Sequence, residues 1–287
     1  MNSLHLTSEA ARRFMRRALM LYTPVPDIGA ALAHHGYIQI DPINVTGRMH
    51  DLILRNRVEG YREGGLMRHL HGDGAPLPAA RRTAFEHHIP AAGILVAFTL
   101  DAWPHLQATM RARQHRTSSW SGRFSPRQKQ LVPRLLAGIT ARGPMCSEDF
   151  AASGRARSFW GASTQAKTAL QKLFFHGRLL IARRSEGNRR YYDLPERVLP
   201  ARVLAWPEPK KNESTRWEAL LKLRQRRLVL LKKKELPLVE NLVQPVRIDG
   251  LPLLHCLQSD LPFLKLVILS AAKNPPSRPC CWPLWTL

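Results

Sequence analysis

The stretch LLIARRSEGNRRYY at residues 179–192 decides the fold of this chain. Its first and last three residues are rich in side chains that favour β-strands. The four residues between the two arginine pairs, SEGN, include the glycine and asparagine that hairpin turns prefer. The stretch therefore predicts two short antiparallel strands joined by a tight turn.

Three helical segments precede this predicted hairpin. The first has apolar residues at helical spacing over 131–139 and ends at the Gly-Pro pair 143–144, and a short second helix begins after Ser147. Thr164 caps the third helix, and Gly177 closes it. Helix, helix, helix and hairpin is the order of a winged helix-turn-helix domain, whose third helix enters the major groove of DNA.

Several side chains of this predicted domain have the chemistry that binds DNA. We predict base contacts from the third helix and phosphate contacts from the hairpin, because basic groups on a wing lie beside the backbone of the duplex. Winged helices also serve as protein-binding scaffolds, but the charge of the chain favours DNA. The predicted contacts are Lys167, Gln171 and Lys172 on the helix and Arg183, Arg184, Arg189 and Arg190 on the hairpin.

A weaker version of the same pattern follows. Between residues 214 and 257, a basic helix precedes two β-rich runs that flank an Asp-Gly turn at 249–250. The expected fold class is therefore mainly α with small β-hairpins (α+β), built from tandem winged helix-turn-helix domains. We place a winged-helix-like domain at residues 1–120, a second winged helix at 121–200, a third at 201–266, and a tail that we expect to be disordered at 267–287.

Local signals also predict the elements of the first domain. Helices are expected from Thr7 or Ser8, between Asp27 and Gly36, and from Asn44 onward, because capping residues precede apolar residues at helical spacing. Residues 85–110 are expected to be mostly helical, with interruptions at prolines.

The charge of the chain indicates its class of partner. Its 44 Lys and Arg residues against 21 Asp and Glu residues give a formal net charge of +23, spread along the chain. Each basic side chain docked on a phosphate releases counterions, so nucleic acid is the natural partner. RNA or ribosome binding would rest on charge alone, because no aromatic recognition strand of the RRM type is visible.

Membrane and metal functions have little support. No apolar run approaches the ~18 residues of a spanning helix, and the N-terminus lacks the apolar core of a signal peptide. We expect a cytoplasmic, nucleoid-associated protein. The four cysteines show neither C-x-x-C spacing nor a histidine at ligand spacing, so we expect no metal site and no disulfide framework.

A second informative motif is Gln39-Ile40-Asp41, within GYIQIDPINVTGR at residues 36–48. In an extended segment, side chains alternate between two faces, so Ile38 and Ile40 would anchor the segment while Gln39 and Asp41 share the other face. The following proline favours an extended conformation at Asp41. The pair suggests chemistry on nucleic acid, although a strand with two solvated polar residues would give the same pattern.

These two motifs resemble the YcaQ-like family of crosslink-repair DNA glycosylases, which are built from tandem winged helices. The matching pieces are residues 37–44 with Arg48 and Arg57, and the stretch RRYYDLPERVLP at 189–200. The likeness extends from about residue 5 to about residue 265. It implies hydrolysis of the N-glycosidic bond of alkylated or interstrand-crosslinked bases in double-stranded DNA, by a monomer without a cofactor.

The resemblance also implies which residues act. The Gln–apolar–Asp motif of the family matches Gln39, Ile40 and Asp41, which makes Gln39 and Asp41 the expected catalytic residues. A carboxylate can stabilise positive charge on the deoxyribose or activate the attacking water. The amide of Gln39 can orient that water. Arg48 and Arg57 are expected to contact DNA.

The chain departs from the family pattern in two places. Where the family has Glu-aromatic-Trp-x-His, this chain has Glu86, His87, His88 and later Pro90, so a substrate contact there is not implied. The family continues into a further β segment where this chain ends, which suggests a C-terminal truncation. The alternative to a glycosylase is therefore a non-catalytic winged-helix DNA-binding protein, either a transcription regulator or an inactive truncated relative.

Overall fold

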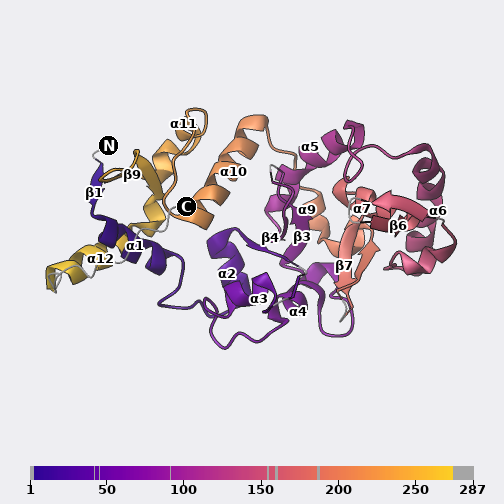
Figure 1. The fold of residues 1–287 in the computed structure, drawn as a ribbon, viewed down its shortest axis with the longest axis horizontal. Coiled ribbons are helices and arrows are strands. Elements are labelled where there is room, and N and C mark those ends of the chain that lie inside the picture. The colour runs from indigo at the N-terminus through magenta and orange to yellow at the C-terminus, as the bar shows by residue number, and fades with distance from the viewer. Residues whose placement is uncertain are drawn as a thin grey trace. The chain divides into compact units, whose positions relative to one another are not determined.

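A computed structural model describes the backbone of residues 3–41, 43–44, 46–90, 92–153, 155–158, 161–185 and 188–273. The chain divides into two compact units (Figure 1). One unit joins the N-terminal segment up to Thr23 to the segment that starts at Glu218, and the other runs from Pro24 to Trp217. This grouping crosses the predicted 1–120 boundary, because the first strand pairs with a strand from the far end of the chain.

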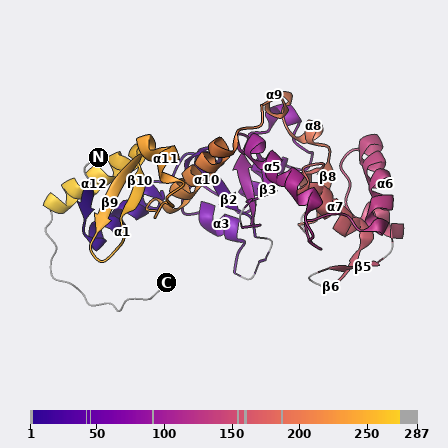
Figure 2. The same ribbon diagram turned by 90° about the horizontal axis from the view of Figure 1, so that it is seen from above.

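The first unit is built on a three-stranded sheet in the order β1-β9-β10. Strand β1 (Leu4–Leu6) pairs in parallel with β9 (Val243–Ile248), and β10 (Leu254–Leu257) pairs antiparallel with β9 around the predicted 249–250 turn. Helices α1 (Ser8–Ala18) and α12 (Leu261–Lys273) pack together (Figure 2). The unit also contains most of α10 (Lys211–Arg226) and the short α11 (Leu236–Val239).

Helix α12 corrects part of the predicted tail. It continues to Lys273, and Val267 is fully buried in a cluster with Phe14 and Leu264. Residues 267–273 therefore belong to a helix, and the buried Val267 lies in the cluster that joins this helix to α1. The rest of the predicted tail, 274–287, lies outside the described residues.

The second unit begins with a short helix that leads into a sheet. Helix α2 (Ile28–His35) starts at the Asp27 cap and ends at Gly36, whose φ of 79° needs a residue without a side chain. Strand β2 (Tyr37–Gln39) follows at once. Helices α3 (Met49–Leu54) and α4 (Gly65–His71) come next, so the expected third helix starts at Met49, five residues after Asn44.

The sheet of this unit corrects the predicted helix at 85–110. Strands β3 (Ala84–His88) and β4 (Leu95–Thr99) form an antiparallel hairpin, and the sheet has the order β2-β4-β3. All five residues of β3 are buried, and so are four of the five in β4. Strands buried on both faces show no two-residue alternation, so their sequence resembles that of a buried helix. The later part of the stretch is helical, in α5 (Ala102–His115).

The winged helix appears where the sequence predicted it. It consists of α6 (Pro126–Arg142), the short η2 (Glu148–Ser153), α7 (Gln165–Phe175), and the hairpin of β7 (Leu180–Arg184) with β8 (Arg190–Asp193). An additional hairpin, β5 (Arg155–Ser158) and β6 (Gly161–Thr164), lies between η2 and α7 (Figure 2). Short helices α8 (Pro195–Val198) and α9 (Ala201–Leu204) then lead to α10.

Candidate active site

The Gln39-Ile40-Asp41 segment has the predicted alternation. Ile38 and Ile40 are each 3% exposed, whereas Gln39 and Asp41 are half-buried. The backbone N–H of Ile40 donates to the carbonyl of Leu95, which extends the pairing of β2 with β4 by one residue. Two buried isoleucines therefore hold the segment in place while its two polar side chains remain accessible to a ligand.

The backbone orients the carboxylate of Asp41. Its Oδ1 accepts a hydrogen bond of 2.9 Å from the N–H of Ile43, which turns the chain directly after the strand. Within the described part of the chain, no basic side chain forms an ion pair with Asp41. Gln39 lies on the edge strand and pairs in register with Val96. The buried His87 pairs with the same Val96 from the other side of β4. Asp41 is thus a positioned carboxylate that has no counter-ion among the described residues.

A cavity of about 330 Å³ opens a few residues after Asp41. The segment returns on itself through a bridge between Asn44 and Arg48, and then enters α3. Side chains from this loop, from α3 and from the segment before α4 line the cavity, namely Thr46, Arg48, Asp51, Leu52, Arg55, Tyr61 and Glu63, together with Gly47. The cavity therefore follows the predicted catalytic motif directly along the chain.

Asp51 and Tyr61 form the base of this cavity. The Tyr61 hydroxyl donates to Asp51 Oδ1 at 2.6 Å, and the N–H of Gly64 donates to the same oxygen at 3.0 Å. Burial, with the hydrogen bond to Asp51, raises the pKa of Tyr61 above its usual value near 10. These residues were missed by the sequence analysis, because a single acid in a six-residue helix gives no signal of its distant partners.

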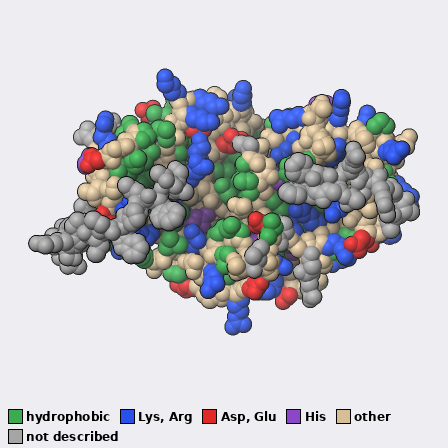
Figure 3. Space-filling view, in the orientation of Figure 1, with side chains coloured by type: hydrophobic (Ala, Val, Ile, Leu, Met, Phe, Trp, Pro, Cys, Tyr) green, Lys and Arg blue, Asp and Glu red, His purple; other side chains and the backbone are tan. Residues whose placement is uncertain are grey.

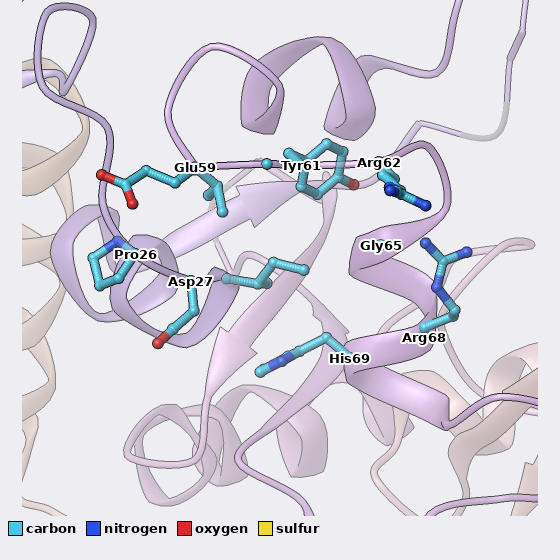
Figure 4. Close-up of a pocket in the computed structure, with 11 residues that line it drawn as sticks. Pro26, Asp27, Glu59, Tyr61, Arg62, Gly65, Arg68 and His69 are labelled. Atoms are coloured by element: carbon cyan, nitrogen blue, oxygen red, sulfur yellow. The ribbon is translucent and has the colours of Figure 1, made fainter.

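A second hollow, of about 430 Å³, shares Tyr61 with this cavity as a lining residue. Figure 4 shows Asp27 and Glu59 toward one end of it and Arg62 and Arg68 toward the other. Asp27 already accepts the N–H of Ala30 as the cap of α2. The lining thus contains both acidic and basic side chains, and the carboxylate of Asp27 already caps a helix.

The Glu86 carboxylate is sealed in the interior, and this defines its role. It is 1% exposed, accepts a hydrogen bond from Arg184 Nε at 2.7 Å, and receives another from His71 Nε2 at 2.6 Å. Burial alone would raise the pKa of Glu86, but the charge and hydrogen bonds of Arg184, with His71, hold it well below its usual value. Glu86 therefore joins the sheet to the wing hairpin and does not face substrate.

His87 and His88 are also interior residues, not a surface pair. His87 donates from Nε2 to the carbonyl of Phe174 at 3.0 Å, and the ring of His88 stacks on Phe175 with centroids 4.2 Å apart. Burial lowers the pKa of His87 to about 4, so the ring is neutral at pH 7. Both side chains attach β3 to α7 of the winged helix.

The predicted DNA contacts on α7 have different surroundings. Lys167 is exposed and Gln171 is half-buried. Lys172 is buried, and its Nζ donates to the carbonyl of Arg123 at 2.7 Å. Because its ammonium is already used inside the protein, Lys172 does not suit the predicted groove contact.

The arginines of the hairpin separate in the same way. Arg189 is exposed and pairs with Glu148 at 2.9 Å, while Arg190 is half-buried. The guanidinium of Arg183 lies 3.5 Å from the ring centre of Tyr191. The Arg184 side chain is 4% exposed and held by Glu86, so its predicted phosphate contact does not fit the structure.

The two arginines near the catalytic motif differ as well. Arg48 is half-buried at the cavity described above. Arg57 donates from its guanidinium to the carbonyl of Ile53 at 2.8 Å, and burial lowers its pKa. Across the face shown in Figure 3, blue Lys and Arg side chains are widely scattered. Arg48 is thus better placed than Arg57 to meet a ligand in the cavity.

The described residues contain no group of three or more His, Cys, Asp or Glu side chains that could hold a metal ion. None of the helices in the described ranges is long and apolar enough to cross a bilayer.

Comparisons with known proteins address the family directly. A family model described as "DNA glycosylase AlkZ-like" matches residues 32–231, which include the Gln39-Ile40-Asp41 motif, the cavity and the winged helix. In fold, the chain is similar to the Streptomyces sahachiroi DNA glycosylase AlkZ, with a TM-score of 0.60 and 13% identity over 91% of this chain and 72% of that one. The family match confirms the resemblance that the two motifs indicated. The chain belongs to the DNA glycosylase AlkZ-like family.

Proposed function

We propose that this DNA glycosylase releases alkylated bases, including those in interstrand crosslinks, and that Asp41 and Gln39 carry the reaction. The observation that supports the assignment best is the state of the Asp41 carboxylate. It is half-exposed, held by the backbone N–H of Ile43, and free of any ion pair among the described residues. A carboxylate in this state keeps its charge available for a cationic transition state.

The chemistry follows from the substrate. An N7-alkylated purine is cationic, so breaking its bond to C1′ releases a neutral base and leaves positive charge on the deoxyribose. Asp41 stabilises that charge and accepts a proton from the attacking water, whose oxygen bonds to C1′. The Gln39 amide orients the water, because it offers both a donor and an acceptor. The products are the free base and an abasic site.

The partner is double-stranded DNA, bound by a monomer that stays with the nucleoid. The exposed Lys167 and Arg189 and the formal charge of +23 support binding to a polyphosphate. The sequence has no obvious dimerisation heptad.

The variant Asp41→Asn tests the proposal. Release of N7-methylguanine from a methylated duplex should fall by about 10²–10³-fold, the usual cost of removing one preorganised electrostatic group. Affinity for the same duplex should stay within about twofold, because the amide keeps the side-chain shape. The matched control is Asp73→Asn, since Asp73 is an exposed acid of the same unit. No release by the wild-type protein, or full release by Asp41→Asn, would refute the assignment.

A further inference from the structure

We propose that the cavity between residues 46–48, α3 and residues 61–63 binds one phosphate of the DNA strand that carries the damaged base. Arg48 and Arg55 would be the ligands, and Arg55 has no role in the resemblance or in the catalytic assignment. The inference rests on the proposed function, since it presumes a damaged DNA strand at Asp41. The inference adds the site at which a phosphate of that strand binds.

Among the described residues, the two arginines of the cavity have donors without a hydrogen-bond partner. The Nε of Arg48 is buried and has no hydrogen-bond partner among the described residues. Arg55, at the C-terminal end of α3, lines the same cavity and is exposed. Within the described ranges, no hydrogen bond or ion pair engages its guanidinium. A buried N–H without an acceptor is costly, so the site lacks an acceptor that a ligand can supply.

The acids in the cavity are less available than the arginines. Asp51 is buried; its Oδ1 already accepts from Tyr61 and Gly64, and its Oδ2 lies 3.7 Å from His50 Nε2 without a hydrogen bond among the described residues. Glu63 is exposed and can turn toward solvent. The groups left for a ligand are therefore two guanidinium forks, whose planar donors match the oxygens of a phosphate.

The chain limits where this phosphate can lie. Four residues lie between Asp41 and Thr46, so the five backbone steps that join them span at most about 18 Å. Phosphates and deoxyriboses alternate along the backbone of one DNA strand, so a strand with a sugar at Asp41 also has phosphates close by. A phosphate in the cavity is therefore within a few nucleotides of a sugar at Asp41. A grip so close to the reaction site holds the sugar in position while the base leaves.

A pair of variants with opposite expected signs tests the site. The probe is a duplex with a tetrahydrofuran abasic analogue, so that affinity is measured without excision. Arg55→Gln should weaken binding about tenfold, the usual loss for one charge-assisted hydrogen bond. Glu63→Gln should tighten binding by about twofold, since it removes a repelling charge. A cavity that binds a cationic group would give the opposite signs and overturn the proposal.

A second measurement identifies the phosphate. The same duplex is prepared with one neutral methylphosphonate at each position in turn. At one position near the abasic analogue, the methylphosphonate should weaken binding by the wild-type protein. Binding by Arg55→Gln should be almost unaffected at that position. The matched control is Arg62→Gln, an exposed arginine outside this cavity, which should stay sensitive at that position. If the methylphosphonate weakened binding by Arg55→Gln as much as binding by the wild-type protein at every position, the contact would be refuted.

The two proposals can fail separately. Release of N7-methylguanine is measured on a different duplex and reports on Asp41. If release is absent but the methylphosphonate position is found, the strand grip stands and the catalytic assignment fails. If release depends on Asp41 but no position couples to Arg55, the reverse is true. Thermal unfolding of each variant checks that the exposed substitutions leave the fold intact.

Discussion

Two carboxylates of one sheet, Asp41 and Glu86, occupy opposite situations. Asp41 follows the edge strand β2, is half-buried, and receives one backbone hydrogen bond. Glu86 lies in β3, is sealed from solvent, and is held by Arg184 and His71. The charge of Glu86 is neutralised inside the protein, whereas that of Asp41 remains available. The same functional group thus serves structure in one strand and is free for chemistry beside another.

The comparison matters because both residues match the family motifs. A search by residue type alone would treat them alike, since each is an acid at a position where the family pattern has one. Burial and counter-ions separate them. An acid held by a buried arginine and a histidine stabilises the fold, so its replacement should lower the free energy of unfolding. An acid without such neighbours should appear in the rate of base release instead.

The largest effect on stability is expected for Glu86→Gln. This change leaves Arg184 buried without its counter-ion, which should lower the free energy of unfolding by about 3–5 kcal/mol. Urea unfolding at pH 7 measures the loss. The control is Glu196→Gln on α8, an exposed acid expected to change stability by less than about 0.5 kcal/mol. A loss below about 1 kcal/mol for Glu86→Gln would remove the contrast with Asp41.

The low pKa of Glu86 predicts how the stability of the protein changes in acid. The folded protein holds the pKa of Glu86 below its usual value, because Arg184 and His71 outweigh the effect of burial. Its stabilising contribution is therefore complete above the unfolded pKa and is lost as the pH falls through the folded one. The gap in unfolding free energy between wild type and Glu86→Gln should be widest near pH 7 and narrow below about pH 4. A gap that widens in acid would contradict the ion pair.

Local chemistry explains how much of the fold could be predicted. Thr7, Asp27 and Thr164 each cap a helix that starts where the sequence indicated, because a capping side chain bonds a backbone N–H only three residues further along the chain. The hairpin at 180–193 was predictable from its turn. In contrast, the strands at 84–99 were taken for a helix, since burial on both faces removes the alternation that identifies a strand.

The site was predictable in part for the same reason. The alternation of Ile38 and Ile40 with Gln39 and Asp41 is a local property of one strand, and burial confirms it. The contacts of Glu86 are not local, because 98 residues separate it from Arg184. Such pairs depend on tertiary packing, so Arg184 looked like a phosphate ligand. The catalytic roles of Gln39 and Asp41 stay predictions that the assay must test.

The smallest expected effects concern two lysines of one helix, which differ in burial as Asp41 and Glu86 do. Lys167 is exposed on α7, whereas Lys172 is buried and bonded to the Arg123 carbonyl. Lys167→Ala should reduce the slope of log affinity against log salt by about 0.9, the value for one lost phosphate contact. Lys172→Met should leave that slope unchanged and instead lower the free energy of unfolding by about 1–2 kcal/mol, since the Arg123 carbonyl loses its donor. Titration of duplex DNA at several salt concentrations, with urea unfolding of both variants, checks the pair. If Lys172→Met changed the salt slope and Lys167→Ala did not, burial would be a poor guide to which charges serve DNA in this protein.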